Sequence, residues 1–252
     1  MATCEAAVLK SPRLRKKVQF YDLPSRNCER NPMAVNRGWV DLIKELRGCT
    51  YQFGLITEDS PVYSLEFDEG LTDTEIASIE SRYQFRFPPD LRGFLQTALP
   101  KGPQFPDWRA GDEQTIRDWM DTPKQGVLFD IKHNDFWLPR WGPRPSSSAE
   151  AIRMVEALLS TAPRLIPLFS HRMMPDEPHL PGNPVFSVHQ TDIIPYGFDL
   201  TDYLRQEFHL PGRESWPETI RPIRFWGLDP FREVHWGPEG SCVIDDCRDR
   251  LA

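Results

Sequence analysis

The spacing of hydrophobic residues changes along this chain of 252 residues, and the change limits the folds that it can adopt. In several stretches before residue 160, apolar residues recur with the period of an amphipathic helix. From residue 165 to residue 197 they form short runs or alternate with polar residues, which is typical of β-strands. The sequence therefore predicts helices first, and then strands of one sheet over residues 165–197.

The bulk composition fits an ordinary globular protein, with 39% hydrophobic and 27% charged residues. The net charge of −7 argues against a nucleic-acid partner, because such surfaces need a basic excess. No stretch approaches the roughly 20 apolar residues of a membrane span. The five scattered cysteines suit reduced thiols. We therefore expect no membrane partner and a cytoplasmic location, with the nucleus left open.

Two helix starts are clear in the first part of the chain. Asn36 is a good N-cap for a helix from about residue 38 to residue 47. Thr72 and Glu75 have the spacing of a capping box, which predicts a second helix. The run Phe85–Pro89 must interrupt this helix, because proline disfavours a helical conformation in the residue before it. The last proline of the run can open a third helix at its first position.

The middle of the chain gives weaker signals. Phe105–Arg109 is expected to be a short strand, and Asp112–Met120 a short helix that is ended by Pro123. The apolar run Val127–Ile131 has the length of a strand or a buried turn. The aromatic residues, prolines and glycine of Asn134–Pro145 predict an aromatic loop.

Caps and alternation predict the later elements. These are a helix from a capping box of Ser147 and Glu150 to about Ser160, strands at Leu165–Phe169, Val185–His189 and Asp192–Tyr196, a helix capped by Asp199, and a final strand at Ile223–Trp226. We expect a basic, flexible N-terminal tail over residues 1–34, one domain over residues 35–227 and a flexible C-terminal tail over residues 228–252.

Two groups of motifs carry a family likeness. The first is Leu71-Thr72-x-x-Glu75-Ile76, followed by Phe87-Pro88-Pro89-Asp90-Leu91-x-x-Phe94-Leu95. The second is longer and more specific, and combines Leu165–Arg172, Gly182–Ile194, Tyr196-Gly197 and Leu200-x-x-Tyr203-Leu204. Over about residues 36–227, these motifs resemble the SUKH superfamily, which includes the yeast Knr/Smi regulators of cell-wall synthesis.

The resemblance implies a single α+β domain with helices packed on a mixed, mainly antiparallel sheet. It also implies a non-catalytic protein-interaction module without a cofactor. Members act as scaffolds and regulators, or as immunity proteins that neutralise toxins, so the resemblance leaves the protein partner open.

Several residues are candidates for a site. His171, His189 and Asp192 offer the residue types of a hydrolase, which is a remote alternative because the chain has no Gly-x-Ser-x-Gly elbow. Cys242 and Cys247 lack the further ligands of a structural zinc site, so no metal is expected. Because Trp, Tyr and Arg dominate interface hot spots, the aromatic loop can bind protein, although its rings also suit a core. The protein-binding candidates are Trp137, Arg140, Trp141, His171, Arg172, His189, Asp192 and Tyr196.

The most specific short motif is Arg15-Lys16-Lys17-Val18-Gln19-Phe20, which resembles the docking peptide that binds protein phosphatase 1. In an extended peptide, Val18 and Phe20 point to the same side and can enter apolar pockets beside a sheet edge. Lys17, Val18 and Phe20 are therefore docking candidates for an alternative function, that of a phosphatase-docking regulatory subunit. A basic leader or an edge strand of the domain would show the same pattern.

Overall fold

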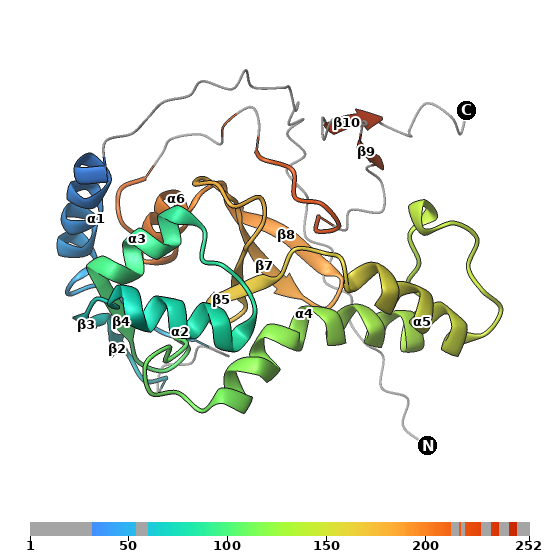
Figure 1. The fold of residues 1–252 in the computed structure, drawn as a ribbon, viewed down its shortest axis with the longest axis horizontal. Coiled ribbons are helices and arrows are strands. Elements are labelled where there is room, and N and C mark those ends of the chain that lie inside the picture. Colours follow the sequence, from blue (N-terminus) through green and yellow to red (C-terminus); the bar gives the residue numbers. More distant parts are fainter. Residues whose placement is uncertain are drawn as a thin grey trace.

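The computed structural model of this chain describes residues 32–53, 60–212, 217, 220–227, 233–236 and 242–245. It shows the α+β class that the sequence predicts, with antiparallel sheets and separate helices (Figure 1). The helices are α1 (Pro32–Leu46), α2 (Asp73–Tyr83), α3 (Pro89–Thr97), α4 (Glu113–His133), α5 (Ser148–Leu159) and α6 (Leu200–Glu207), with a short 3-10 helix at Pro139–Trp141.

The strands form one four-stranded sheet and three pairs. The four-stranded sheet contains β5 (Leu165–Phe169), β6 (Arg172–Pro175), β7 (Val185–His189) and β8 (Asp192–Gly197). The pairs are β1 (Thr50–Tyr51) with β2 (Tyr63–Ser64), β3 (Glu66–Glu69) with β4 (Ala98–Lys101), and β9 (Glu233–Trp236) with β10 (Cys242–Asp245).

The central sheet has the order β5-β6-β7-β8, and each neighbouring pair is antiparallel. The strands predicted over residues 165–197 are thus confirmed, and β6 is added to them. The hydrophobic core has two clusters. One joins Val185 to Phe94 of α3 and Leu204 of α6, and the other joins Phe186 to Val127 of α4. Since Val185 and Phe186 are neighbours in β7, the two clusters lie on opposite faces of the sheet.

The capping box at the start of α2 is confirmed. The hydroxyl of Thr72 accepts a hydrogen bond from the Glu75 N–H at 3.2 Å, and the Glu75 carboxylate accepts one from the Thr72 N–H at 2.7 Å. Pro89 opens α3 at its first turn, as predicted. The linker between the two helices is held by Glu80, whose carboxylate accepts a hydrogen bond from the N–H of Phe87 at 2.9 Å.

One end of each of two predicted helices was wrong, and so was the capping box of a third helix, α5, whose ends at Ser147 and Ser160 are confirmed. α1 begins at Pro32, so Asn36 lies inside the helix and is not its N-cap. The helix after Asp112 does not end before Pro123 but continues as α4 to His133. Ser147 does precede α5, yet its side chain makes no capping hydrogen bond.

Several predicted strands were also wrong. Val127–Ile131 belongs to α4. Phe105–Arg109 forms bends and a turn. The turn is stabilised by the Asp107 carboxylate, which accepts hydrogen bonds from the N–H groups of Arg109 and Ala110. Ile223–Trp226 is irregular, although Ile223 and Trp226 are buried and the Trp226 indole N–H donates to the carbonyl of Pro163 at 2.6 Å. The stretch predicted as a C-terminal tail contains the β9–β10 pair.

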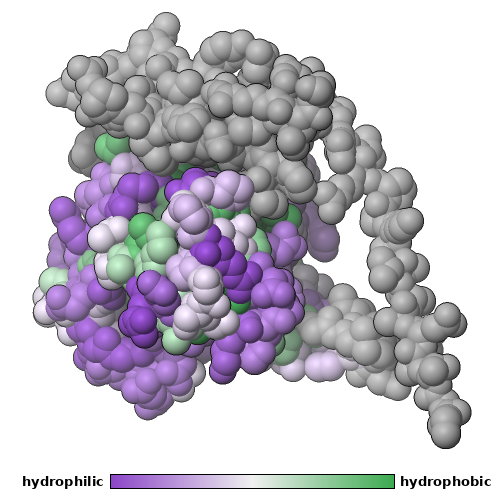
Figure 2. Space-filling model, turned by 90° about the vertical axis from the view of Figure 1, so that its right-hand side faces the viewer, coloured by the Kyte–Doolittle hydropathy of each residue, from purple (hydrophilic) through white to green (hydrophobic). Residues whose placement is uncertain are grey.

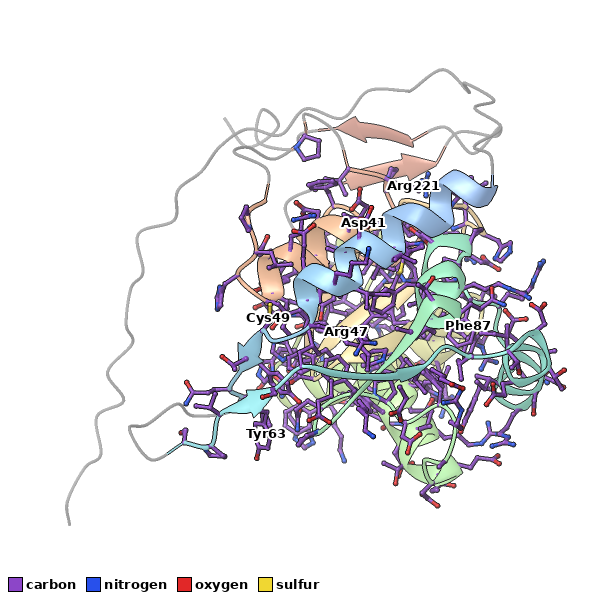
Figure 3. The ribbon with its side chains drawn as sticks, turned by 90° about the vertical axis from the view of Figure 1, so that its left-hand side faces the viewer. Asp41, Arg47, Cys49, Tyr63, Phe87 and Arg221 are labelled. Atoms are coloured by element: carbon purple, nitrogen blue, oxygen red, sulfur yellow. The ribbon has the colours of Figure 1, made fainter. Side chains whose placement is uncertain are left out.

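Long-range polar contacts join the first and second groups of motifs. The Asp90 carboxylate, at the start of α3, accepts a hydrogen bond from the N–H of Gly182 at 2.7 Å. Arg221, which is labelled in Figure 3, donates to the Asn183 side-chain oxygen at 2.7 Å and to the Pro181 carbonyl at 2.9 Å. The loop between β6 and β7 is therefore fixed to α3 and to the segment that follows α6.

Asp176, which directly follows β6, should make stability depend on pH. Its carboxylate accepts a hydrogen bond from the Arg164 N–H at 2.8 Å, but burial raises its pKa from 3.8 to about 6. Because the folded-state pKa is the higher one, the contribution of this group is complete below about pH 4 and is lost as the pH rises through about 6. Asp176→Asn keeps the acceptor without the charge.

We expect Asp176→Asn to raise the free energy of unfolding by about 1–2 kcal/mol at pH 7. The gain is smaller than the full pKa shift implies, because the side chain is only partly buried and solvent screens its charge. At pH 4 the variant and the wild type should differ little. Urea unfolding at the two pH values measures both differences. A variant that is less stable at pH 7 would contradict the assigned cost of the buried carboxylate.

Candidate functional site

One end of the sheet face that α6 covers is exposed to solvent. The register places Arg172 opposite Ser187 and Ser187 opposite Ile194, so these side chains leave the sheet on the same side. His189 and Asp192 are the next pair on that side. We call this surface the open sheet face. It consists of His171, Arg172, Ser187, His189, Asp192, Ile194 and Tyr196.

The exposure of these residues follows the alternation of the strands. Ile194 is 50% exposed although it is apolar, whereas its neighbour Ile193 is 3% exposed and belongs to the core on the other face. His171, His189 and Asp192 are also exposed. The open sheet face therefore has an apolar side chain among polar and ionisable ones.

Arg172 is the most constrained residue of the open sheet face. Its Nε donates to the Glu207 carboxylate at 2.9 Å, and its Nη1 donates to the Ser187 hydroxyl at 2.6 Å. Its guanidinium carbon lies 3.6 Å from the ring centroid of Tyr196. The Arg172 and Glu207 side chains are only 12% and 15% exposed. These contacts hold Arg172 and Tyr196 in one arrangement and fix β6 and β8 to α6.

The contacts of His171 define its protonation. Nη1 of Arg172 lies 2.6 Å from Nε2 of His171, and since a guanidinium can only donate, this nitrogen accepts. The ring proton of the neutral imidazole is then on Nδ1, which donates to the Ser170 hydroxyl at 3.2 Å. Burial, followed by the nearby Arg172 and His189, lowers the pKa of His171 and favours this neutral form.

The hydrogen bond between Ser170 and His171 runs in the wrong direction for catalysis. In a catalytic pair the histidine must accept the proton of the serine hydroxyl. The Ser170 hydroxyl here accepts from His171, and Arg172 occupies the other ring nitrogen. His189 and Asp192 are brought together only as a register pair beside the β7–β8 turn. The contacts therefore lend no support to the hydrolase alternative.

The long helix α4 supports both turns beside the open sheet face. The indole N–H of Trp119 donates to the Ser170 carbonyl in the β5–β6 turn at 2.9 Å. In the β7–β8 turn, the Asp130 carboxylate accepts from the Thr191 N–H at 3.0 Å and from its hydroxyl at 2.6 Å. Asp130 is only 5% exposed, so this turn is held by a buried, paired acceptor.

Sequence reasoning missed several residues that build the site. Gly126 gives the β7–β8 turn its close approach to α4, since an added Cβ there would lie 2.6 Å from Cα of Gln190. No sequence motif marks Gly126 or Asp130. Glu207 could not be recognised either, because its partner Arg172 is 35 residues away in the sequence. Ile194 could have been found, because two adjacent isoleucines in one strand cannot both face the same core.

The edges of the central sheet are poor templates for a further strand. In the edge strand β8, Pro195 has no N–H, and the N–H of Ile193 already donates to the Thr191 carbonyl at 3.0 Å. The other edge strand, β5, contains Pro167. A protein that contacts this sheet is therefore expected to bind its face.

The rings of the aromatic loop pack against the core, which the sequence left open beside a recognition surface; a binding role for Trp137 and Arg140 stays a prediction. Trp141 is 6% exposed and belongs to the cluster around Phe186. Trp137 is half-buried, contacts Trp141 edge-on at 5.3 Å and donates its indole N–H to the Gly142 carbonyl at 2.8 Å. Arg140 is exposed. The side of the molecule on which α5 lies is mainly hydrophilic (Figure 2).

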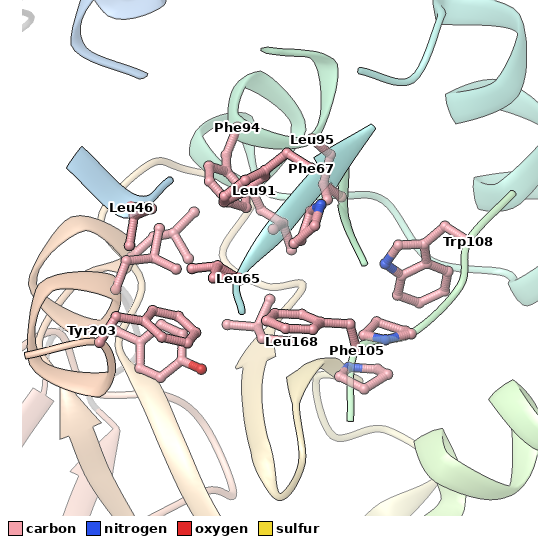
Figure 4. A pocket seen from close by; sticks show the side chains of 16 residues that line it. Leu46, Leu65, Phe67, Leu91, Phe94, Leu95, Phe105, Trp108, Leu168 and Tyr203 are labelled. Carbon is pink, nitrogen blue, oxygen red and sulfur yellow. The ribbon is translucent and has the colours of Figure 1, made fainter. Parts of the chain in front are cut away.

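A small cavity lies within the core cluster that contains Phe94 and Leu204, between α3, α6 and β5 (Figure 4). Its volume is about 20 Å³, which is room for one water molecule. The walls are apolar and aromatic, and include Leu95, Phe105 and Leu168. The hydroxyl of Tyr203, also at the cavity, is buried without a hydrogen-bond partner among the described residues.

Within the described ranges, no three His, Cys, Asp or Glu residues are grouped so that they could hold a metal ion. None of the described helices combines the length and the apolar character needed to cross a membrane. Cys247 and the docking candidates Lys17, Val18 and Phe20 lie outside the described residues.

Comparisons of the chain with protein-family models, with curated proteins and with solved structures found no match.

Proposed function

We propose that this chain is a non-catalytic, cytoplasmic protein-interaction module, and that its partner binds the open sheet face. The observation that carries the proposal is Ile194, an apolar side chain that is 50% exposed in the middle of an ordered strand. An exposed apolar side chain that is surrounded by polar ones and lies near Arg and Tyr has the composition of an interface hot spot with its polar rim.

The surroundings of Ile194 support this role. The open sheet face also contains Arg172 and Tyr196, two residue types that are enriched in hot spots. The Arg172 guanidinium carbon lies 3.6 Å from the Tyr196 ring centroid, and Glu207 holds Arg172 in place. A binding surface that is already ordered loses little conformational entropy when a partner binds. The exposed His171 and Asp192 would form the polar rim of such an interface.

The resemblance to the SUKH superfamily supports the same kind of function. The first group of motifs forms α2 and α3, and the second forms most of the central sheet and α6. Asp90 and Gly182, one from each group, are hydrogen-bonded at 2.7 Å. The motif residues thus build one continuous unit around the open sheet face, and membership of the superfamily is part of the proposal.

Capture of partners by immobilised full-length chain, measured by quantitative mass spectrometry, tests the proposal. Ile194→Asp places a charge at the proposed anchor. Leu180→Asp is the matched control, because Leu180 is 53% exposed on the β6–β7 loop. We expect the wild type and Leu180→Asp to capture the same proteins at micromolar concentration. Ile194→Asp should capture at least about tenfold less of each of them.

Equal retention by all three proteins would contradict the role of the open sheet face. Turnover in a panel of hydrolase substrates, abolished by His171→Ala or His189→Ala, would instead establish the hydrolase alternative. The phosphatase-docking alternative stays a prediction from the motif at Lys17–Phe20. It requires that Val18→Ala with Phe20→Ala abolish capture of protein phosphatase 1 and leave the unfolding midpoint unchanged.

A further inference from the structure

The open sheet face and the N-terminal segment have complementary residues with the same period. Along β8, Asp192, Ile194 and Tyr196 are anionic, apolar and aromatic, at every second position. In the N-terminal segment, Lys16, Val18 and Phe20 are cationic, apolar and aromatic, again at every second position. Alternate side chains of an extended segment are about 6.5–7 Å apart, which is also the spacing of Asp192 and Ile194 along β8. Tyr196 lies at a bulge in the pairing with β7, and its stacking with Arg172 keeps its ring on the open sheet face.

We propose that residues 16–20 are an intramolecular ligand of the open sheet face, with Lys16 at Asp192, Val18 at Ile194 and Phe20 at Tyr196. This inference rests on the proposed function and adds its regulation, since the docked segment covers the surface that a partner would need. The segment lies on the face of the sheet and does not pair with β8 as a further strand. Pairing is disfavoured because Pro195 has no N–H and the N–H of Ile193 is already hydrogen-bonded.

Contacts on the open sheet face favour a cation at Asp192. Arg172 is neutralised by Glu207 at 2.9 Å, and its contact with Nε2 keeps His171 neutral. Asp192 is exposed and has no ion pair among the described residues. His189, its register partner, is the other titratable group at this corner.

The charge of the whole chain favours the same contact. Residues 1–31 contain seven Lys and Arg and three Asp and Glu, a net charge of +4. Because the chain carries −7, the remaining 221 residues carry −11. Opposite charges of this size attract the segment to the domain over roughly a Debye length of 8–10 Å at physiological salt.

The linker is long enough for the contact. Residues 21–31 separate Phe20 from Pro32, the first residue of α1. Eleven extended residues span up to roughly 36–40 Å. The linker does not have to pass around a domain that is roughly 40 Å across, because α1 lies on the side of the sheet that α6 covers, where Glu45 of α1 pairs with Arg205 of α6 at 2.8 Å. Tethering by such a linker gives an effective concentration near the millimolar range, so even weak contacts would be occupied.

Cross-linking within the full-length chain tests the inference. With Ile194 replaced by photo-reactive p-benzoylphenylalanine, irradiation should join position 194 to residues 13–22 of the same chain. Val18→Ala with Phe20→Ala should reduce this product about fivefold or more. Asp192→Lys should also reduce it, and Lys16→Asp in the same chain should restore it. Urea unfolding confirms that each variant is folded.

The control places the same photo-reactive residue at Leu180, which is as exposed as Ile194. Equal cross-linking from both positions would overturn the inference, as would a product that the two alanines do not change. A mixture of isotopically light and heavy chains identifies a second copy as the occupant, which would overturn it too. If partner capture still depends on Ile194 while no cross-link to residues 13–22 forms, the docking is rejected and the proposed function stands.

Discussion

Replacing Gly126 with alanine is expected to lower the free energy of unfolding by about 3 kcal/mol or more. The added Cβ would lie 2.6 Å from Cα of Gln190, and this atom belongs to backbone that cannot rotate away. Either α4 or the β7–β8 turn must move. That movement also stretches the hydrogen bonds from Thr191 to the buried Asp130 carboxylate, so two costs add.

Gly38→Ala is the matched control. Gly38 is also helical, in α1, but nothing lies within 4 Å of an added Cβ. Alanine there should raise the free energy of unfolding by about 0.5–1 kcal/mol, because glycine is the poorer helix former. Urea denaturation of both variants measures the two signs. If Gly126→Ala is as harmless as Gly38→Ala, α4 does not support the β7–β8 turn.

Arg172→Ala is expected to cost about 2–4 kcal/mol, somewhat less than the loss of one partner from a fully buried ion pair. The variant leaves the Glu207 carboxylate, only 15% exposed, without its partner, and it removes the stacking on Tyr196. A second replacement, Glu207→Leu, removes the stranded charge. The double variant should therefore regain more than half of the lost stability.

An exposed ion pair provides the comparison for Arg172. Lys44 and Asp41 pair at 3.2 Å with side chains that are 69% and 73% exposed, and Lys44→Ala should cost less than about 0.5 kcal/mol. Equal effects of Arg172→Ala and Lys44→Ala in chemical denaturation would mean that Arg172 does not fix the open sheet face.

The elements predicted correctly are those whose signals are local. Thr72 and Glu75 are three residues apart, so the capping box could be recognised from the sequence and is formed in the structure. The β7–β8 hairpin is equally local, because only two residues separate its strands. Alternation in these strands also placed Phe186 in the core, where it is 2% exposed.

The largest error of the sequence prediction was to end the helix after Asp112 before Pro123. Tertiary contacts explain why α4 continues through this proline. Proline costs a helix about 3 kcal/mol in isolation. Here Pro123 is buried, and the following turns bury Val127 and Ile131 and pair Asp130 with Thr191. These contacts offset the local cost, but they depend on a hairpin about 60 residues later in the chain.

The candidate site was predicted only in part. His171, Arg172, His189, Asp192 and Tyr196 were named as binding candidates. The register brings Arg172, His189 and Asp192 to the open sheet face, and contacts with Arg172 place His171 and Tyr196 there. What makes the face rigid comes from other elements. The contributions of α4 and α6 depend on side chains that meet only in the fold, and no periodic signal marks them.

The most direct test of the open sheet face as the binding site is calorimetric titration of a captured, purified partner against three forms of the chain. We expect the wild type and Leu180→Asp to bind with the same Kd, and Ile194→Asp to bind at least about tenfold more weakly, since the partner would bury the new charge without an opposite charge beside it. If Leu180→Asp weakens binding instead and Ile194→Asp does not, the partner binds the β6–β7 loop and not the open sheet face.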